Sequence, residues 1–149
     1  MKQTFVKEYT LKSKPTNREA KQLKDSRETY EELRAIFDPE TEALFESSYV
    51  LYLNQDQRLK GFMRLSDGGL THVIVDPRKI MMGAIGSLAT AIILSHNHPS
   101  GNPRPSEEDR RLTQKLLAAC KLMDICFIDH IIMGSGCYYS FRDHGEMMI

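Results

Sequence analysis

The sequence predicts an α/β or α+β domain built on a mixed β-sheet. Helical and strand-like patterns alternate along the chain, which favours helices packed on a sheet over an all-α or all-β fold. Residues 49–65 and residues 125–141 each resemble two strands joined by a short turn. Because hairpins pair their strands antiparallel, we expect a mixed sheet rather than a purely parallel one.

The overall composition is that of an ordinary globular domain. Of 149 residues, 41% are hydrophobic and 27% are charged. A chain of this length can form one core that buries roughly two-thirds of its unfolded surface. We therefore expect residues 1–149 to form a single domain, with an N-terminal strand and helix in residues 1–45 and the motif-bearing core in residues 46–141.

Charge and cysteine content narrow the class of protein. Twenty basic residues balance twenty acidic ones, which counts against DNA or an anionic membrane as the partner. No stretch approaches the ~20 apolar residues of a membrane span, and the first residues carry no signal-peptide core. The three cysteines form no C-x-x-C pair, so neither a disulfide framework nor a thiolate zinc site is indicated. We expect a cytoplasmic protein.

The N-terminal part is expected to contribute one strand and one or two helices. Residues 4–11 alternate like an edge strand, and breaker residues follow at 12–17. Ser26 is a suitable cap for a helix that ends before Asp38, and a short second helix can follow in residues 39–45. The buried face of the first helix should consist of Tyr30, Leu33, Ile36 and Phe37, and its solvated face of Glu28, Glu31, Glu32 and Arg34.

The remaining elements follow from apolar runs bounded by turn residues. The expected strands are residues 49–53, 58–65, 70–75, 91–94, 125–133 and 137–141. Asp76 followed by Pro77 resembles a helix cap with a first-turn proline, and Gly83 and Gly86 in that helix either allow close packing or mark its end. Ser106 begins the best-marked helix, because acidic residues fill its first turn and an apolar stripe follows.

The most informative stretch follows the strand at residues 91–94. His96 and His98 lie two positions apart, so on extended backbone their imidazoles point to one side while Asn97 points to the other. Two neutral imidazoles aimed at one point can bind a divalent metal. A bare H-x-H pair is nevertheless more often two exposed histidines with ordinary hydrogen-bond partners.

Asp109 can supply a third ligand, because the proline-rich loop at residues 99–105 can return the chain to the histidines. Two nitrogens and one carboxylate oxygen suit zinc with an open position, where bound water becomes acidic enough for hydrolysis. Asp109 is also placed to be the capping partner of Ser106. Ser106 is in turn either a helix cap or a donor to an oxyanion. The general base should be a carboxylate from elsewhere, which spacing does not identify.

These residues resemble the JAMM metalloprotease motif of the JAB/MPN superfamily, in which an upstream Glu precedes H-x-H-P and then S-x-x-D. Residues 96–99 match the first part and residues 106–109 the second. The letters SHNHPSGNP at residues 95–103, with DH at 129–130 and YSF at 139–141, resemble the bacterial RadC branch in particular.

The resemblance implies a fold, a cofactor and a reaction. The fold would be cytidine-deaminase-like, with a mixed sheet flanked by helices. Zn²⁺ would be held by His96, His98 and Asp109. Glu46, which opens the stretch ESSYVLYLN, would activate water, and Ser106 would stabilise the oxyanion. The implied reaction is hydrolysis of a peptide or isopeptide bond in a peptide or protein substrate.

Two departures from the RadC pattern stand out. DPR at residues 76–78 replaces a common HPR, at a position that looks structural. The segment before Glu46 lacks the glycine hairpin of the helix-hairpin-helix module that larger RadC proteins carry. The chain thus resembles a stand-alone catalytic-type domain without the part that would contact DNA. The resemblance to RadC, rather than the charge, suggests an alternative function: a non-enzymatic accessory protein in DNA repair or mobile-element biology that retains the metal site, for which salt-dependent DNA binding would be the support.

Other chemistry has less support. Zinc deamination is set aside because the H-x-E and P-C-x-x-C signatures are missing. His130, in an apolar run, is expected to be a satisfied core residue with Asp129 as a candidate partner. His72 and His144 carry no pattern, and we do not expect any of these three histidines to bind metal.

Overall fold

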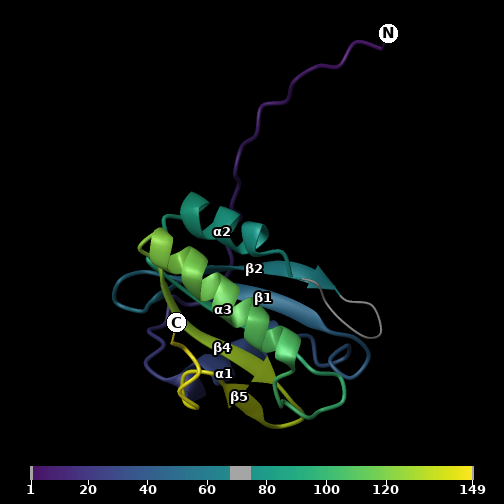
Figure 1. The fold of residues 1–149 in the computed structure, drawn as a ribbon, viewed down its shortest axis with the longest axis vertical. Helices are drawn as coiled ribbons and strands as arrows, with labels where there is room; N and C mark the ends of the chain where they lie inside the picture. Colours follow the sequence, from purple (N-terminus) through teal and green to yellow (C-terminus); the bar gives the residue numbers. More distant parts are fainter. Residues whose placement is uncertain (1, 68–74, 149) are drawn as a thin grey trace.

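The computed structural model describes residues 2–67 and 75–148, and a five-stranded sheet in the order β2-β1-β3-β4-β5 lies at its centre (Figure 1). The strands are β1 (Ser47–Leu53), β2 (Leu59–Asp67), β3 (Ala91–Asn97), β4 (Cys126–Met133) and β5 (Tyr138–Ser140), and the helices are α1 (Ser26–Ile36), α2 (Pro77–Gly86) and α3 (Glu107–Leu122). Neighbouring described strands pair antiparallel except β3 and β4, which pair parallel. The expected mixed sheet is confirmed. Of the strand expected at residues 70–75, only residue 75 is described, and His72 lies outside the described residues.

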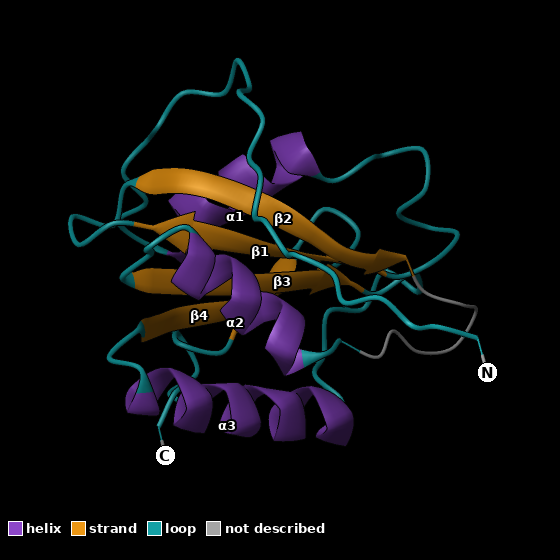
Figure 2. Cartoon of the chain, turned by 90° about the horizontal axis from the view of Figure 1, so that it is seen from above, coloured by secondary structure: helices purple, strands orange, loops and turns teal. Residues whose placement is uncertain are grey.

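Helices cover both faces of the sheet (Figure 2). On one face α1 contributes Leu33 and Phe37 to a buried cluster. On the other face α2 and α3 contribute a second cluster that includes Ile80 and Leu116. β1 and β3, the two strands between β2 and β4, are buried along their whole length. The central strands are therefore rigid supports for whatever lies at their ends.

The topology gathers three chain segments at one end of the sheet. α3 follows β3 and precedes the parallel strand β4, so the carboxyl end of β3 and the start of α3 lie close together. β1 is antiparallel to β3, which brings the start of β1 to the same end. The region outside the carboxyl ends of parallel strands is where open α/β sheets bind ligands.

Helix α1 forms where the apolar spacing predicts, but two details differ. Its cap is Asp25, whose side chain accepts from the Glu28 N–H, rather than Ser26. The Ser26 hydroxyl is instead bonded to Tyr138 Oη at 3.0 Å, so it joins the helix to β5. Glu32 was expected in solvent, yet it is only 6% exposed and pairs with Arg18 at 2.8 Å.

The strand expected at residues 4–11 does not form, and this prediction is wrong. The segment runs away from the body (Figure 1), with Val6 99% exposed. At the start of β2, the outer edge of the sheet is paired with the backbone around residue 22 instead. There the Leu59 N–H donates to the Lys21 carbonyl and the Leu23 N–H donates to the Gln57 carbonyl. An alternating pattern without a free edge gives no strand.

The second helix expected at residues 39–45 is also absent, and turns occupy the segment. The carboxylate of Asp38 does accept from the Glu40 N–H, as a cap would. The carbonyls of Glu42 and Phe45, however, accept hydrogen bonds from a side chain of β3 instead of from helix amides. Tertiary contacts thus replace the local helix.

Helix α2 confirms the predicted cap and close packing. Asp76 caps it through the Arg78 N–H, with Pro77 in the first turn. A Cβ at Gly83 would lie 2.0 Å from Tyr52 Oη, so glycine is needed for the helix to approach β1. No helix in the described parts of the chain has the length and apolar character of a membrane span. The cytoplasmic location stays a prediction.

Candidate functional site

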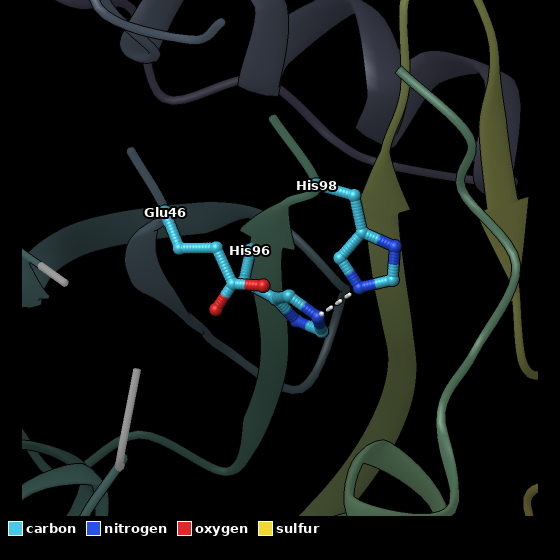
Figure 3. A group of neighbouring side chains, drawn as sticks. All are labelled: Glu46, His96 and His98. Carbon is cyan, nitrogen blue, oxygen red and sulfur yellow. Dashed lines mark hydrogen bonds between the residues drawn. The ribbon is translucent and has the colours of Figure 1, made fainter. Parts of the chain in front are cut away.

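The two histidines lie at the end of β3, which runs three residues beyond the predicted strand. His96 is inside the strand and 6% exposed, and His98 follows directly after it. Both rings point to one side, and their Nε2 atoms are 3.1 Å apart (Figure 3). Asn97 points to the opposite side, as alternation along a strand requires.

Asp109 lies against both rings from the first turn of α3. Its Oδ1 is 3.1 Å from His96 Nε2 and its Oδ2 is 3.3 Å from His98 Nε2. It also forms a capping box with Ser106, in which each residue's side chain bonds the other's backbone N–H. The two roles open for Asp109 therefore coexist, since the cap holds the carboxylate where it meets the histidines.

The electrostatics of the cluster follow from these contacts. Burial alone would raise the pKa of Asp109, but hydrogen bonds from His96 and His98 outweigh it and hold that pKa far below its usual range. Burial would lower the pKa of His98, yet its bonds to Asp109 and to Asn102 raise it. The site therefore favours a carboxylate beside positive charge.

A buried chain of hydrogen bonds fixes the tautomer of His96. The Thr113 hydroxyl donates to the Asp109 carbonyl at 2.8 Å, so it must accept from His130 Nδ1, 2.7 Å away. Burial holds the pKa of His130 well below its usual value, and the neutral ring then accepts at Nε2 from His96 Nδ1, at 2.9 Å. When the His96 ring is neutral, its Nε2 carries a lone pair that faces Asp109 Oδ1, 3.1 Å away.

His98 is oriented in the same sense by a simpler contact. Its Nδ1 lies 2.9 Å from the Asn102 carbonyl, which can only accept. A neutral His98 therefore also presents an Nε2 lone pair to the cluster. Two nitrogen lone pairs and a carboxylate converge, and acceptors placed so closely need a proton or a cation between them.

Glu46 reaches the cluster from a distant part of the chain. It immediately precedes β1, and its carboxylate lies beside the histidines (Figure 3). Glu46, His96 and His98 each offer a ligand atom, all within 4.8 Å of one another. Its charge also contributes to the raised pKa of His98. The group can hold a metal ion, and two carboxylates flank the histidine pair.

Ser106 lies at the helix cap rather than between the histidines. Its Oγ accepts from the Asp109 N–H at 3.1 Å, and the residue is exposed. Because the oxygen is the acceptor in this bond, its own hydrogen is not used there.

Of the other described histidines, His130 supports the cluster from behind His96, and His144 makes no contact with it. His130 is fully buried, as expected, but its ring contacts Thr113 and His96 instead of Asp129. The predicted partner Asp129 does bond His130, but through the backbone: its carboxylate accepts from the His130 N–H at 2.8 Å, as well as from the Ser140 hydroxyl and the Arg142 N–H. The Nδ1 of His144 contacts the Ser140 carbonyl, away from the other three rings.

Local residue spacing does not predict the contact between His130 and His96, because a β-bulge creates it. Ile92 pairs with Phe127 but Ile93 pairs with Asp129, so Ile128 is the extra residue in β4. Without that bulge, His130 would point to the opposite face of the sheet. An open cavity of about 110 Å³ beside His98, with walls that include Pro39, Ala43 and Met133, could not be predicted from residue spacing either.

Comparison with known proteins places most of the chain in one family. Residues 23–146 match the model of the RadC-like JAB domain. A UPF0758 protein of Haemophilus ducreyi is 44% identical over 112 residues, which cover 73% of this chain and 50% of that protein. A UPF0758 protein of Porphyromonas gingivalis is 44% identical over 124 residues, 83% of this chain and 53% of that protein. The chain thus spans about half the length of these curated relatives.

Proposed function

The chain belongs to the family of RadC-like JAB domain proteins, and from this premise we propose that it is a zinc-dependent hydrolase of peptide or isopeptide bonds. The observation that carries the proposal is the convergence of His96, His98 and Asp109 at the end of β3. The three side chains present two nitrogens and a carboxylate with their acceptor atoms 3.1 to 3.3 Å apart.

These separations support a small tetrahedral cation. Ligands at about 2.0–2.1 Å from a tetrahedral zinc ion lie about 3.3 Å from one another. His96, His98 and Asp109 would therefore hold Zn²⁺ with little movement, and the His130 and Asn102 contacts already orient the two rings for it. A carboxylate oxygen of Glu46 lies within 4.8 Å of a ring nitrogen of each histidine, but the direct contacts of Asp109 make Asp109 the third ligand in this proposal.

When bound there with an open position, zinc would supply an acidified water, with a pKa lowered toward ~7, and would polarise a carbonyl. Beside it, the Glu46 carboxylate accepts the water proton and returns it to the leaving amine. The Ser106 O–H donates to the oxygen of the tetrahedral intermediate while its Oγ still caps α3.

The substrate is proposed to be a peptide or protein segment bound across the end of the sheet. The cavity beside His98 is open to solvent and has apolar walls at Pro39, Ala43 and Met133. It can receive an apolar side chain next to the scissile bond.

A peptide-library cleavage screen tests the function. The protein loaded with Zn²⁺ should cleave a subset of peptides, and a chelator should abolish this cleavage. Glu46→Gln should reduce the cleavage rate by about 10²- to 10⁴-fold. Glu46→Gln should keep its zinc. Cleavage that persists in Glu46→Gln would remove Glu46 as the base, and a wild type that cleaves nothing would contradict the hydrolase proposal.

A further inference from the structure

Asn97 lies between the two histidines, but its side chain enters the opposite side of the sheet. It is 2% exposed and none of its atoms takes part in the histidine cluster. We propose that Asn97 is the positioning residue for Glu46: its carboxamide binds the backbone on both sides of Glu46 and thereby fixes that carboxylate beside His96 and His98. The catalytic consequence rests on the proposed function, whereas the positioning itself does not.

The contacts of the carboxamide carry this inference. The Ser47 N–H donates to Asn97 Oδ1 at 2.7 Å. Asn97 Nδ2 donates to the Phe45 carbonyl at 3.1 Å and to the Glu42 carbonyl at 2.8 Å. Glu46 is the one residue between Phe45 and Ser47, so the peptide groups that flank it are held from the same side chain.

The chemistry of the carboxamide suits this task closely. A carboxamide offers an acceptor and two N–H donors on one rigid plane, and this site uses all of them. Aspartate would keep the acceptor and lose the donors, and alanine would lose both. The bond from the Ser47 N–H is buried and the two bonds to the carbonyls are partly buried, so loss of the carboxamide leaves backbone groups poorly compensated.

We call the Asn97 carboxamide and its bonds to the backbone on both sides of Glu46 the clamp. The surrounding structure explains why it is needed. Residues 39–45 form turns rather than a helix, so no regular backbone ladder fixes the approach to β1. His96 and His98 are the immediate neighbours of Asn97 in β3 and its continuation. Residues 96–98 thus supply both the two histidine rings and the side chain that positions Glu46. The distance between the Glu46 carboxylate and the histidines is therefore determined by the end of β3 and not by the turns at residues 39–45.

Asn97→Ala and Asn97→Asp test the clamp, with Asn54→Ala as the matched control. Asn54 also accepts from two backbone amides, those of Asp56 and Arg58, but it lies beyond the other end of β1. In metal-free protein, the Ser47 amide should exchange its hydrogen at least about tenfold faster in Asn97→Ala, with the Val50 amide unchanged. Asn97→Asp should keep the Ser47 amide protected, because its acceptor remains.

The consequence for Glu46 is measured with Zn²⁺ and peptide. Asn97→Ala should bind Zn²⁺ within about threefold of wild type, yet lose kcat about as strongly as Glu46→Gln, and the double variant should be no slower than Glu46→Gln alone. A purely structural role would lower zinc affinity and activity together. It would also make the two losses multiply in the double variant, and either result would overturn the inference.

The clamp and the hydrolase proposal fail separately. If the wild type cleaves no peptide, the hydrolase proposal is lost, but the exchange of the Ser47 amide still decides whether Asn97 holds this segment. Unchanged exchange in Asn97→Ala would refute the clamp whatever the activity.

Discussion

The proposed site has a ligand half, formed by His96, His98 and Asp109, and a base half, formed by Glu46. The fold builds these two halves in different ways. His96, His98 and Asp109 come from one continuous stretch, a strand end, a loop and a helix start. Glu46 comes from a segment fifty residues before His96 and owes its place to a side chain on the neighbouring strand. The comparison teaches that local sequence can specify metal ligands, whereas the acid–base group depends on tertiary contacts.

The largest expected effect comes from breaking the ligand half. Asp109→Asn removes the carboxylate that contacts both Nε2 atoms, so affinity for Zn²⁺ should fall by more than about a hundredfold, beyond the usual effect of an outer-shell change. Isothermal titration of metal-free protein measures this. Asp25→Asn, at the cap of α1, is the matched control and should leave affinity unchanged. Equal loss in both variants would mean that the Asp109 carboxylate has no specific part in metal binding.

Ser106→Ala tests whether Ser106 acts in catalysis as well as in holding Asp109, because this residue caps the helix that carries Asp109. The lost cap should cost about 1 kcal/mol of unfolding free energy, and the lost O–H should lower kcat by about a hundredfold. Urea unfolding and peptide cleavage measure the two effects. If the unfolding free energy falls by the expected amount while kcat is unchanged, Ser106 is a helix cap only.

A smaller effect is expected from the hydrogen bonds behind His96. Thr113→Val keeps the shape but removes the acceptor for His130 Nδ1, so the tautomer of His96 is no longer fixed and Zn²⁺ affinity should fall by about tenfold. Thr29→Val is the matched control, because the Thr29 hydroxyl bonds the Asp25 carbonyl in the same way on α1. Equal affinities in the two variants would show that the ligand half needs no such support.

The same contrast explains how far the sequence could be interpreted. Alternation along a strand placed His96 and His98 on one side, and cap chemistry placed Asp109 at a helix start, because both rules act over a few residues. Glu46 could be assigned only by family resemblance. The alternation at residues 4–11 was misleading, since strand formation needs a partner edge that the local pattern does not describe. The bulge at Ile128, which brings His130 to His96, leaves no mark in the local pattern either.

Metal content is the most direct test of the central claim, that His96, His98 and Asp109 form a zinc site. Elemental analysis of purified protein should find about one zinc per chain in wild type and in His144→Ala, whose ring lies away from the cluster. His96→Ala should retain less than about a tenth of that amount. A wild type without zinc, or a His96→Ala variant with as much zinc as wild type, would contradict the account.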